Sequence, residues 1–179
     1  MTVIECLGCG LTHEPAGMPR PAERNATGEC FEEYGLLLAR SSSTPGYRPV
    51  HQLVVDAYTC QHPAGRSRRE VQSTALSLMT LCLFCEEGED PADGSWLHAM
   101  MMRGRPGFFR RLDPPNLTGL LTHRDVSGAQ CPSQHAELAW SWATSVWSVW
   151  ESHHPTVREW NVRTCADVIG RGGRGRPRR

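Results

Sequence analysis

The sequence lacks any apolar run long enough to cross a membrane. Its longest apolar stretch, residues 76–85, is interrupted by Ser77 and Thr80 and falls well short of the ~20 residues that span a bilayer. The N-terminus has neither a basic start nor an apolar run of signal-peptide length. We therefore expect a soluble, cytoplasmic protein that has no membrane partner.

Lysine is also absent, and all 19 basic residues are arginine. An equal number of acidic residues balances them, but five of the arginines lie in residues 171–179. The rest of the chain holds 14 basic and 19 acidic residues, a formal charge of −5. Such an acidic body is a poor surface for nucleic acid, which argues against a nucleic-acid partner. The tail rich in glycine and arginine, residues 169–179, is predicted to be disordered.

Eight cysteines are distributed over the 179 residues. A chain of this length suits one domain and can bury roughly two-thirds of its unfolded surface, so it needs no disulfide to hold a core. In a reducing compartment such thiols serve as metal ligands or as small buried side chains. Cys82 and Cys85 lie within the apolar stretch and are predicted to pack in the core.

Helical periodicity dominates the sequence. The pattern predicts helices over residues 30–40, 49–62, 69–87, 96–102 and 135–154, a helix-starting box at Thr122–Asp125, and a short helix over 158–160. The six tryptophans, four of them between residues 140 and 150, are predicted to be core side chains. The predicted fold is therefore a mainly α, single-domain helical bundle over residues 1–168. Its first 29 residues form a small, loop-rich, cysteine-bearing metal knuckle.

The strongest local motif is Cys6-x2-Cys9 followed by Gly10. Two thiolates at this spacing can fold back onto one tetrahedral ion. A redox-active pair of this kind usually follows a strand and opens a helix, and that context is missing here. Cys30 supplies a third thiolate at the start of its helix, where the helix dipole favours a negative charge.

The fourth ligand is predicted from the pairing of two helices. If the helices over 30–40 and 49–62 are antiparallel neighbours, about 16 Å and about 21 Å long, the end of the second returns to the start of the first. His62 then lies near Cys30, whereas His51 lies at the far end. We predict that one zinc ion is held by Cys6, Cys9, Cys30 and His62. The substitutes for the fourth position are Cys60, His13 and, behind them, His51.

The segment HQLVVDAYTCQHP, residues 51–63, carries several further polar groups. His51, Tyr58 and His62 share one helix face, and Asp56 is one position off it. A buried aspartate is costly unless it is paired. Asp56 is therefore predicted either to anchor a buried hydrogen-bond network, or to orient a metal-bound histidine or act as a general base. In the second case His51, Asp56 and Tyr58 are the candidate catalytic residues.

Several motifs together resemble a known family. They are CLGCG at 6–10, the GEC that ends at Cys30, the segment 51–63, QSTALSLMTLC at 72–82, and WATSVWSVWESHHPTVREW at 142–160. The chain resembles, through them, a bacterial family common in actinomycetes and catalogued as a domain of unknown function. The resemblance implies a small, helical, soluble protein with a cysteine-containing N-terminus and no established activity. The family more often has a proline where this chain has Leu7, which leaves the ligands in place.

Two classes of function follow from these features. One is a non-enzymatic helical protein, stabilised by a structural metal, that binds an unidentified protein partner or small ligand. The other is a metalloenzyme with a site around His51, Asp56, Tyr58 and His62, in which the metal keeps an open position for water or substrate. The number and kind of metal ligands discriminate between the two classes. Three cysteines and one histidine would fill all four tetrahedral positions and leave none for water or substrate.

Overall fold

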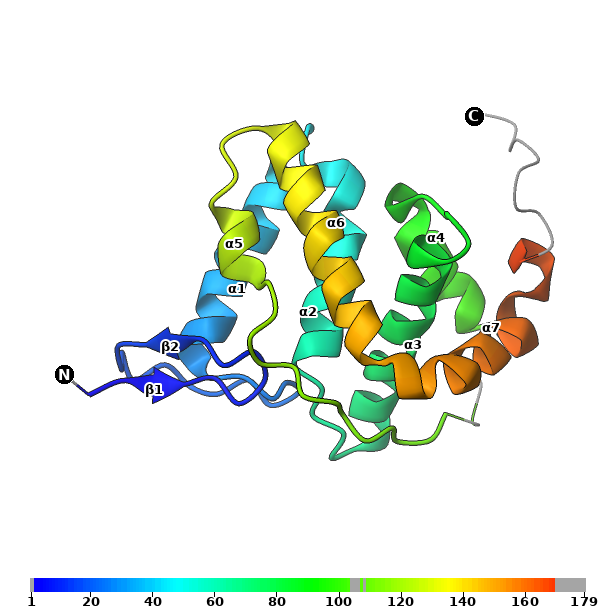
Figure 1. Cartoon of the computed structure of the whole chain (residues 1–179), viewed down its shortest axis with the longest axis horizontal. Helices are drawn as coiled ribbons and strands as arrows, with labels where there is room; N and C mark the ends of the chain where they lie inside the picture. Colours follow the sequence, from blue (N-terminus) through cyan, green and yellow to red (C-terminus); the bar gives the residue numbers. More distant parts are fainter. Residues whose placement is uncertain (1, 104–106, 108, 170–179) are drawn as a thin grey trace.

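The predicted helices form the body of the protein in a computed structural model, which describes residues 2–103, 107 and 109–169. Within this part the α-helices are α1 (Gly28–Ser43), α2 (His51–Gln61), α3 (Arg68–Cys85), α4 (Gly94–Met101), α5 (His123–Ser127), α6 (Pro132–Val149) and α7 (His154–Ile169) (Figure 1). Three short 3₁₀ helices are η1 (Arg48–Val50), η2 (Pro91–Asp93) and η3 (Glu151–His153). Two short strands are β1 (Ile4–Glu5) and β2 (Thr12–His13). The mainly α fold class is confirmed.

Helix α2 is the centre of the core, and it packs mainly against α3 and α6. Its apolar side chains point in several directions, so Leu53, Val54 and Ala57 are all completely buried. Helix α3 adds an unbroken run of buried residues from Leu78 to Phe84. Both Cys82 and Cys85 pack in or against this core, as predicted.

The tryptophans fill much of the remaining core. Trp142, Trp147, Trp150 and Trp160 are buried. The indole N–H of Trp142 donates to Gln61 Oε1 at 2.8 Å and that of Trp150 to the Cys60 carbonyl at 3.2 Å, so the polar edges of these rings are satisfied. The prediction is wrong for Trp96, whose side chain is exposed on α4. A short helix on the surface presents one face to solvent.

Helix α1 is longer at both ends than its apolar pattern predicted. It begins at Gly28 because the Thr27 hydroxyl accepts a hydrogen bond from the Cys30 amide at 3.2 Å, which caps the first turn. At the other end the serines at 41–43 extend the helix instead of breaking it. Each of their hydroxyls donates to the carbonyl three residues earlier, and this local bonding is compatible with a last helical turn.

Helix α7 was predicted as a piece of three residues, and it is much longer. Helix α6 ends at Val149, and after η3 a new helix starts at His154. Pro155 lies in its first turn, where a proline needs no hydrogen-bond donor. The proline therefore lies at the start of α7 and does not end α6, which stops at Val149. Val157 and Trp160 pack in the core, and the Asn161 amide donates to the Met79 carbonyl at 3.0 Å, which ties α7 to α3.

The cysteine-bearing N-terminus forms a small antiparallel hairpin at one end of the bundle (Figure 1). Ile4 pairs with His13 and Glu5 with Thr12. Strands of two residues are too short to show alternation in the sequence, which explains why only loops were predicted there. The turn between them is closed by the Cys6 amide donating to the Leu11 carbonyl at 2.8 Å.

Other predictions concern the connections and the tail. The described residues between α4 and α5 form neither an α-helix nor a strand. Thr122 and Asp125 form the expected capping box at the start of α5. No helix in the described ranges is long and apolar enough to cross a membrane. The predicted disordered tail lies, apart from Ile169, outside the described residues.

Candidate metal centre

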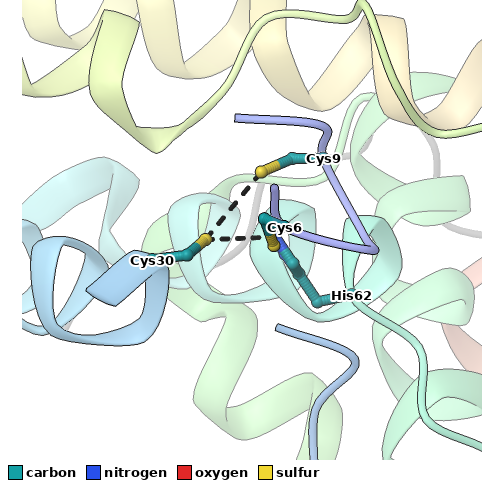
Figure 2. Close-up of side chains that lie close together, drawn as sticks. All are labelled: Cys6, Cys9, Cys30 and His62. Atoms are coloured by element: carbon teal, nitrogen blue, oxygen red, sulfur yellow. Dashed lines mark hydrogen bonds between the residues drawn. The ribbon is translucent and has the colours of Figure 1, made fainter. Parts of the chain in front are cut away.

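Four buried side chains from three separate elements converge beside the turn of the hairpin (Figure 2). Cys6 and Cys9 come from the turn between β1 and β2, Cys30 from the first turn of α1, and His62 from the C-cap of α2. Their ligand atoms all lie within 4.8 Å of one another. A Cys3His group of this kind has the donor set of a structural zinc site.

Two distances between donor atoms match those around a tetrahedral ion. The sulfurs of Cys9 and Cys30 are 3.8 Å apart, and Cys30 Sγ lies 3.5 Å from His62 Nε2. Zinc–sulfur and zinc–nitrogen bonds of about 2.3 Å and about 2.05 Å, at the tetrahedral angle, place two sulfurs about 3.8 Å apart and a sulfur about 3.5 Å from a nitrogen. The four side chains can therefore hold such an ion without a large rearrangement.

The orientation of His62 is fixed by its other ring nitrogen. His62 Nδ1 lies 2.9 Å from the Tyr58 carbonyl, one helical turn earlier. Since a carbonyl can only accept, Nδ1 carries the proton and the lone pair is on Nε2. That lone pair is on the side of Cys30 Sγ. Metal-bound histidines are usually held in this way, by donating the second N–H to a carbonyl or carboxylate.

The three thiols cannot easily ionise together. Hydrogen bonding from Cys30 lowers the pKa of Cys6, and in return the contacts with Cys6 and Cys9 raise the pKa of Cys30 well above its usual range. Burial also raises the pKa of Cys30. A divalent cation at the centre removes this conflict, because it stabilises the deprotonated form of each thiol that it binds.

Two glycines allow the turn that carries Cys6 and Cys9 to lie close to the end of α2. A Cβ atom at Gly8 would collide with the His62 ring and lie within 2.8 Å of the carbonyl oxygens of Asn25 and Gln61. Gly10 has a φ of 78°, which side chains other than glycine rarely adopt. The turn therefore depends on glycine both for its backbone geometry and for its contact with α2.

Tyr58 packs directly against the cluster. Its ring stacks between His62, with the ring centroids 4.0 Å apart, and Tyr34, at 3.6 Å. Its hydroxyl lies 3.6 Å from Cys30 Sγ and can donate to that sulfur. Burial, followed by the nearby Cys30, raises the pKa of Tyr58 far above its usual range, so it remains a neutral donor.

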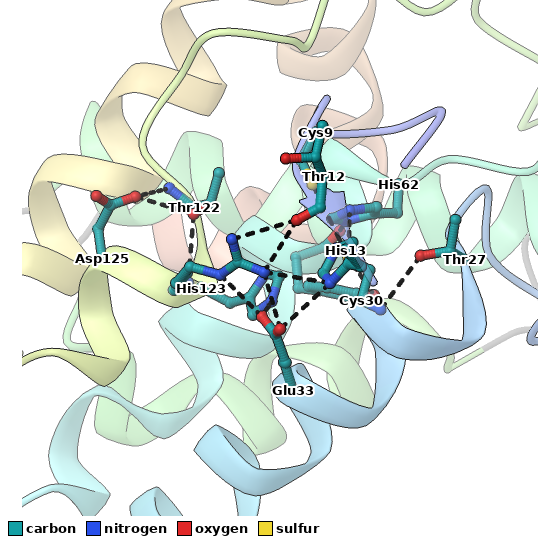
Figure 3. A network of polar contacts seen from close by, with 12 residues as sticks. Cys9, Thr12, His13, Thr27, Cys30, Glu33, His62, Thr122, His123 and Asp125 are labelled. Carbon is teal, nitrogen blue, oxygen red and sulfur yellow. Dashed lines mark hydrogen bonds and ion pairs between the residues drawn. The ribbon is translucent and has the colours of Figure 1, made fainter. Parts of the chain in front are cut away.

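A polar network covers the outer side of the site (Figure 3). Arg124 of α5 makes a two-pronged ion pair with Glu33 of α1, at 3.0 and 2.8 Å. The same guanidinium lies 3.2 Å from His13 Nδ1 and 3.5 Å from the Thr12 carbonyl, both in β2. Arg124 thus joins the hairpin to α1 and α5 and brings a positive charge near the thiols. No local motif pointed to Glu33 or Arg124, which are 91 residues apart in the sequence.

His123 is a further buried group in this layer. Its Nε2 lies 3.4 Å from Glu33 Oε2, but the geometry is not that of a hydrogen bond, and neither ring nitrogen has such a partner among the described residues. Burial, followed by the nearby His62, lowers the pKa of His123 to about 4. A neutral His123 ring lies edge-on to Tyr58, with the centroids 5.6 Å apart.

A comparison with models of protein families shows which family the chain belongs to. Residues 4–151 match the model of a family of unknown function, DUF5946. The chain belongs to this family. No curated protein and no solved structure matches it. The stretch shared with DUF5946 contains the four candidate ligands and the network around them, whereas α7 lies beyond it.

The candidate ligands named from the sequence are now placed in this DUF5946 chain. The four residues predicted to hold the metal are the four that converge. The three substitutes lie outside that group. His13 contacts Glu33 in the outer network, and Cys60 is fully buried, with its pKa raised by desolvation. His51 is bonded to Ser41 Oγ at 2.7 Å, at the far end of α2.

Asp56 is completely buried and does not contact the metal centre. Its Oδ1 accepts from Gln52 Nε2 at 3.2 Å and lies 3.1 Å from His98 Nε2, and its Oδ2 accepts from the Thr80 hydroxyl at 2.8 Å. The predicted buried hydrogen-bond network is therefore present. The interpretation of Asp56 as a carboxylate that orients a metal-bound histidine is wrong, because the side chain points toward α3 and α4.

The candidate catalytic residues do not form a common site. His51 bonds to α1 at the start of α2, Asp56 bonds to α3 and α4 in the middle, and Tyr58 and His62 meet the cysteines at the end. Residues that are seven or more positions apart lie about two turns or more apart along a helix. Sharing one helix face therefore does not bring their side chains together.

Proposed function

We propose that this protein binds one zinc ion through Cys6, Cys9, Cys30 and His62, and that the ion is mainly structural. The observation that carries the proposal is the pair of donor distances, 3.8 Å between sulfurs and 3.5 Å between sulfur and nitrogen, which suit a tetrahedral zinc ion. The protonated Nδ1 of His62 supports it, because Nε2 is left as a ligand.

A structural role is favoured over a catalytic one by the completeness of the donor set. Three thiolates and one imidazole fill all four positions of a tetrahedron, whereas catalytic zinc usually keeps one for water or substrate. The four ligand residues are buried, at 3% exposure or less. The residues that the enzymatic alternative would use, His51 and Asp56, are engaged elsewhere.

The ion would stabilise the hairpin more than the rest of the protein. A two-stranded hairpin is marginally stable by itself in water, and here each strand has only two residues. Zinc would link its turn to both α1 and α2 and so add binding energy to folding. All eight cysteines are free thiols, as expected in a cytoplasmic protein. The closed donor set in turn favours a protein that binds a partner or small ligand without catalysing a reaction.

Metal analysis tests the site directly. Purified wild-type protein is expected to carry about one zinc ion per chain by plasma mass spectrometry. Cys6→Ser, Cys9→Ser and Cys30→Ser should each carry much less. Cys131→Ser is the matched control, because that thiol is exposed and outside the cluster. Equal metal in all five proteins, or none in any of them, would show that the site is wrong.

X-ray absorption at the zinc edge distinguishes the two functional classes. A structural ion should show three sulfur neighbours and one nitrogen neighbour. Fewer sulfurs together with a bound water oxygen would favour the metalloenzyme instead.

A further inference from the structure

The end of α2 opposite the metal centre borders a groove of about 540 Å³. This volume falls within the range of small-molecule sites, roughly 300–1,000 Å³. Its walls come from η1 and the loop before it, from the start of α2, and from η2 and α4. Three prolines stiffen these walls and polar side chains line them: Pro45, Pro49 and Pro91, with Arg48, His51 and Gln52 among the polar ones.

The polar groups in the groove are held in place from behind. His51 Nδ1 lies 2.7 Å from Ser41 Oγ, which leaves the opposite ring nitrogen, Nε2, for the groove. Ser41 is itself fully buried. The imidazole is thus fixed by a partner inside the protein, as in preorganised binding sites.

The Gln52 side chain is fixed even more firmly. Its amide donates to Asp56 Oδ1 at 3.2 Å and accepts from the Ser95 hydroxyl at 3.4 Å. A Cβ atom at Gly94 would collide with Gln52 Cγ, so α4 packs directly on this side chain. The buried Asp56 network therefore serves as the support for one wall of the groove.

The charge of the residues that line the groove indicates which kind of ligand it can bind. Arg48 is exposed and positive, and none of the described residues that line the groove is acidic. Asp56 lies one layer behind, and its charge is offset by His98 at 3.1 Å. A guanidinium can bind a carboxylate through two parallel hydrogen bonds, and its single positive charge matches the single negative charge of that group. The prolines offer apolar contact to an organic group.

We infer that this groove binds a small organic carboxylate, with Arg48 pairing the carboxylate and the prolines contacting the organic part. The inference deepens the ligand-binding part of the proposed function and does not depend on the zinc site. The metal ligand nearest in the sequence, His62, is eleven positions from His51, about 16 Å along a helix. The two sites can therefore fail separately.

Titrations followed by amide NMR spectra test the groove with defined probes. Benzoate should shift the signals of residues that line the groove, and benzamide, its uncharged counterpart, should shift them much less. Arg48→Gln is expected to weaken benzoate binding by about tenfold or more, the usual effect of losing one charge-assisted pair. Arg68→Gln, which removes another exposed arginine outside the groove, should bind as the wild type does.

Several results would overturn the inference. They are the absence of localised shifts with benzoate, equal binding by Arg48→Gln, and equal binding of benzamide. Inorganic phosphate that shifts these signals while benzoate does not would also refute it, because the groove would then be an inorganic anion site. Zinc is measured on the same samples. If Arg48→Gln keeps its zinc but no longer binds benzoate, the result supports a carboxylate site in the groove. If wild type binds benzoate but carries no zinc, only the metal proposal is refuted.

Discussion

At the scale of single residues, the fourth position of the metal centre depends on where α2 ends. His62 is the C-cap of that helix and reaches Cys30, whereas His51 at its start reaches Ser41. Losing a partner that only orients a metal ligand costs about 10–100-fold in affinity. His62→Ala should therefore lower zinc affinity by at least about 100-fold, and His51→Ala should leave it nearly unchanged. Chelator competition measures both, and a weaker His51→Ala would contradict the assignment.

Asp56 provides a second test at this scale, and one that needs no ligand. Asp56→Asn keeps an acceptor for Gln52 and His98, and its amide can face the Thr80 hydroxyl, so the variant should stay folded. Asp56→Leu leaves those buried groups without a partner and should cost about 1–3 kcal/mol of stability. Thermal melts of the three proteins compare them. A leucine variant more stable than wild type would refute the structural role of Asp56.

The pairing of His98 with Asp56 makes stability depend on pH. Burial opposes the charged imidazole, but the carboxylate 3.1 Å away prevails and raises the pKa of His98. The unfolded chain has the lower pKa, about 6.5. The pair therefore contributes fully to stability below that value, and the contribution is lost as pH rises through the raised pKa.

This pH dependence can be measured with one variant. The free energy of unfolding of wild type should exceed that of His98→Gln most at acidic pH, and the difference should shrink in alkaline solution. Urea titrations from about pH 5 to about pH 9 give both curves. A difference that stays constant over this range would mean that His98 does not titrate with the pair.

At the scale of elements, the metal knuckle and α1 use glycine in opposite ways. Gly8 has no room for a side chain, because the knuckle turn rests on His62 and the backbone beside it. Gly35 lies exposed in the middle of α1, and a Cβ atom there would meet nothing within 4 Å. The same substitution should therefore have opposite effects at the two positions.

Gly8→Ala should weaken zinc binding and lower stability, because the turn must move away from α2. Gly35→Ala should raise stability by about 0.5–1 kcal/mol, the usual gain from alanine in a helix interior, and keep wild-type zinc affinity. Urea unfolding and chelator competition on both proteins check this. If Gly8→Ala binds zinc as tightly as Gly35→Ala does, close contact between the turn and His62 is unnecessary.

At the scale of the whole molecule, the helical core and the hairpin should respond differently to metal removal. The core of α2, α3 and α6 is built from large apolar side chains, and it should remain folded in the presence of a chelator and a reductant. The hairpin loses the link to α1 and α2 that the metal would provide. The melting temperature should fall by on the order of 10 °C, as expected for losing a tightly bound ligand.

Hydrogen exchange locates that loss within the molecule. Amides of residues 4–13 should exchange much faster without metal, while those of α2 and α3 stay protected. Re-addition of zinc should restore the protection. Uniform loss of protection over all helices would instead mean that the ion supports the entire core.

The sequence by itself determined the features that are local in the chain. The helices were predicted because apolar residues recur every three or four positions, and most helix positions agree with the structure. The ligand pair Cys6 and Cys9 was recognisable from its spacing. His62 could be chosen because the short connection between α1 and α2 forces them to be antiparallel neighbours, so that one helix ends where the other begins.

Only the tertiary structure decided which distant groups share a site. Arg124 meets Glu33 across 91 positions, and His98 meets Asp56 across 42. Periodicity cannot report such contacts, because they depend on how whole helices pack. The same packing divides α2 into three parts, with the candidate metal ligand His62 at its end, the Asp56 network in its middle and the groove at its start. A helix rises about 1.5 Å per residue, and this rise keeps apart polar groups that stand together in the sequence.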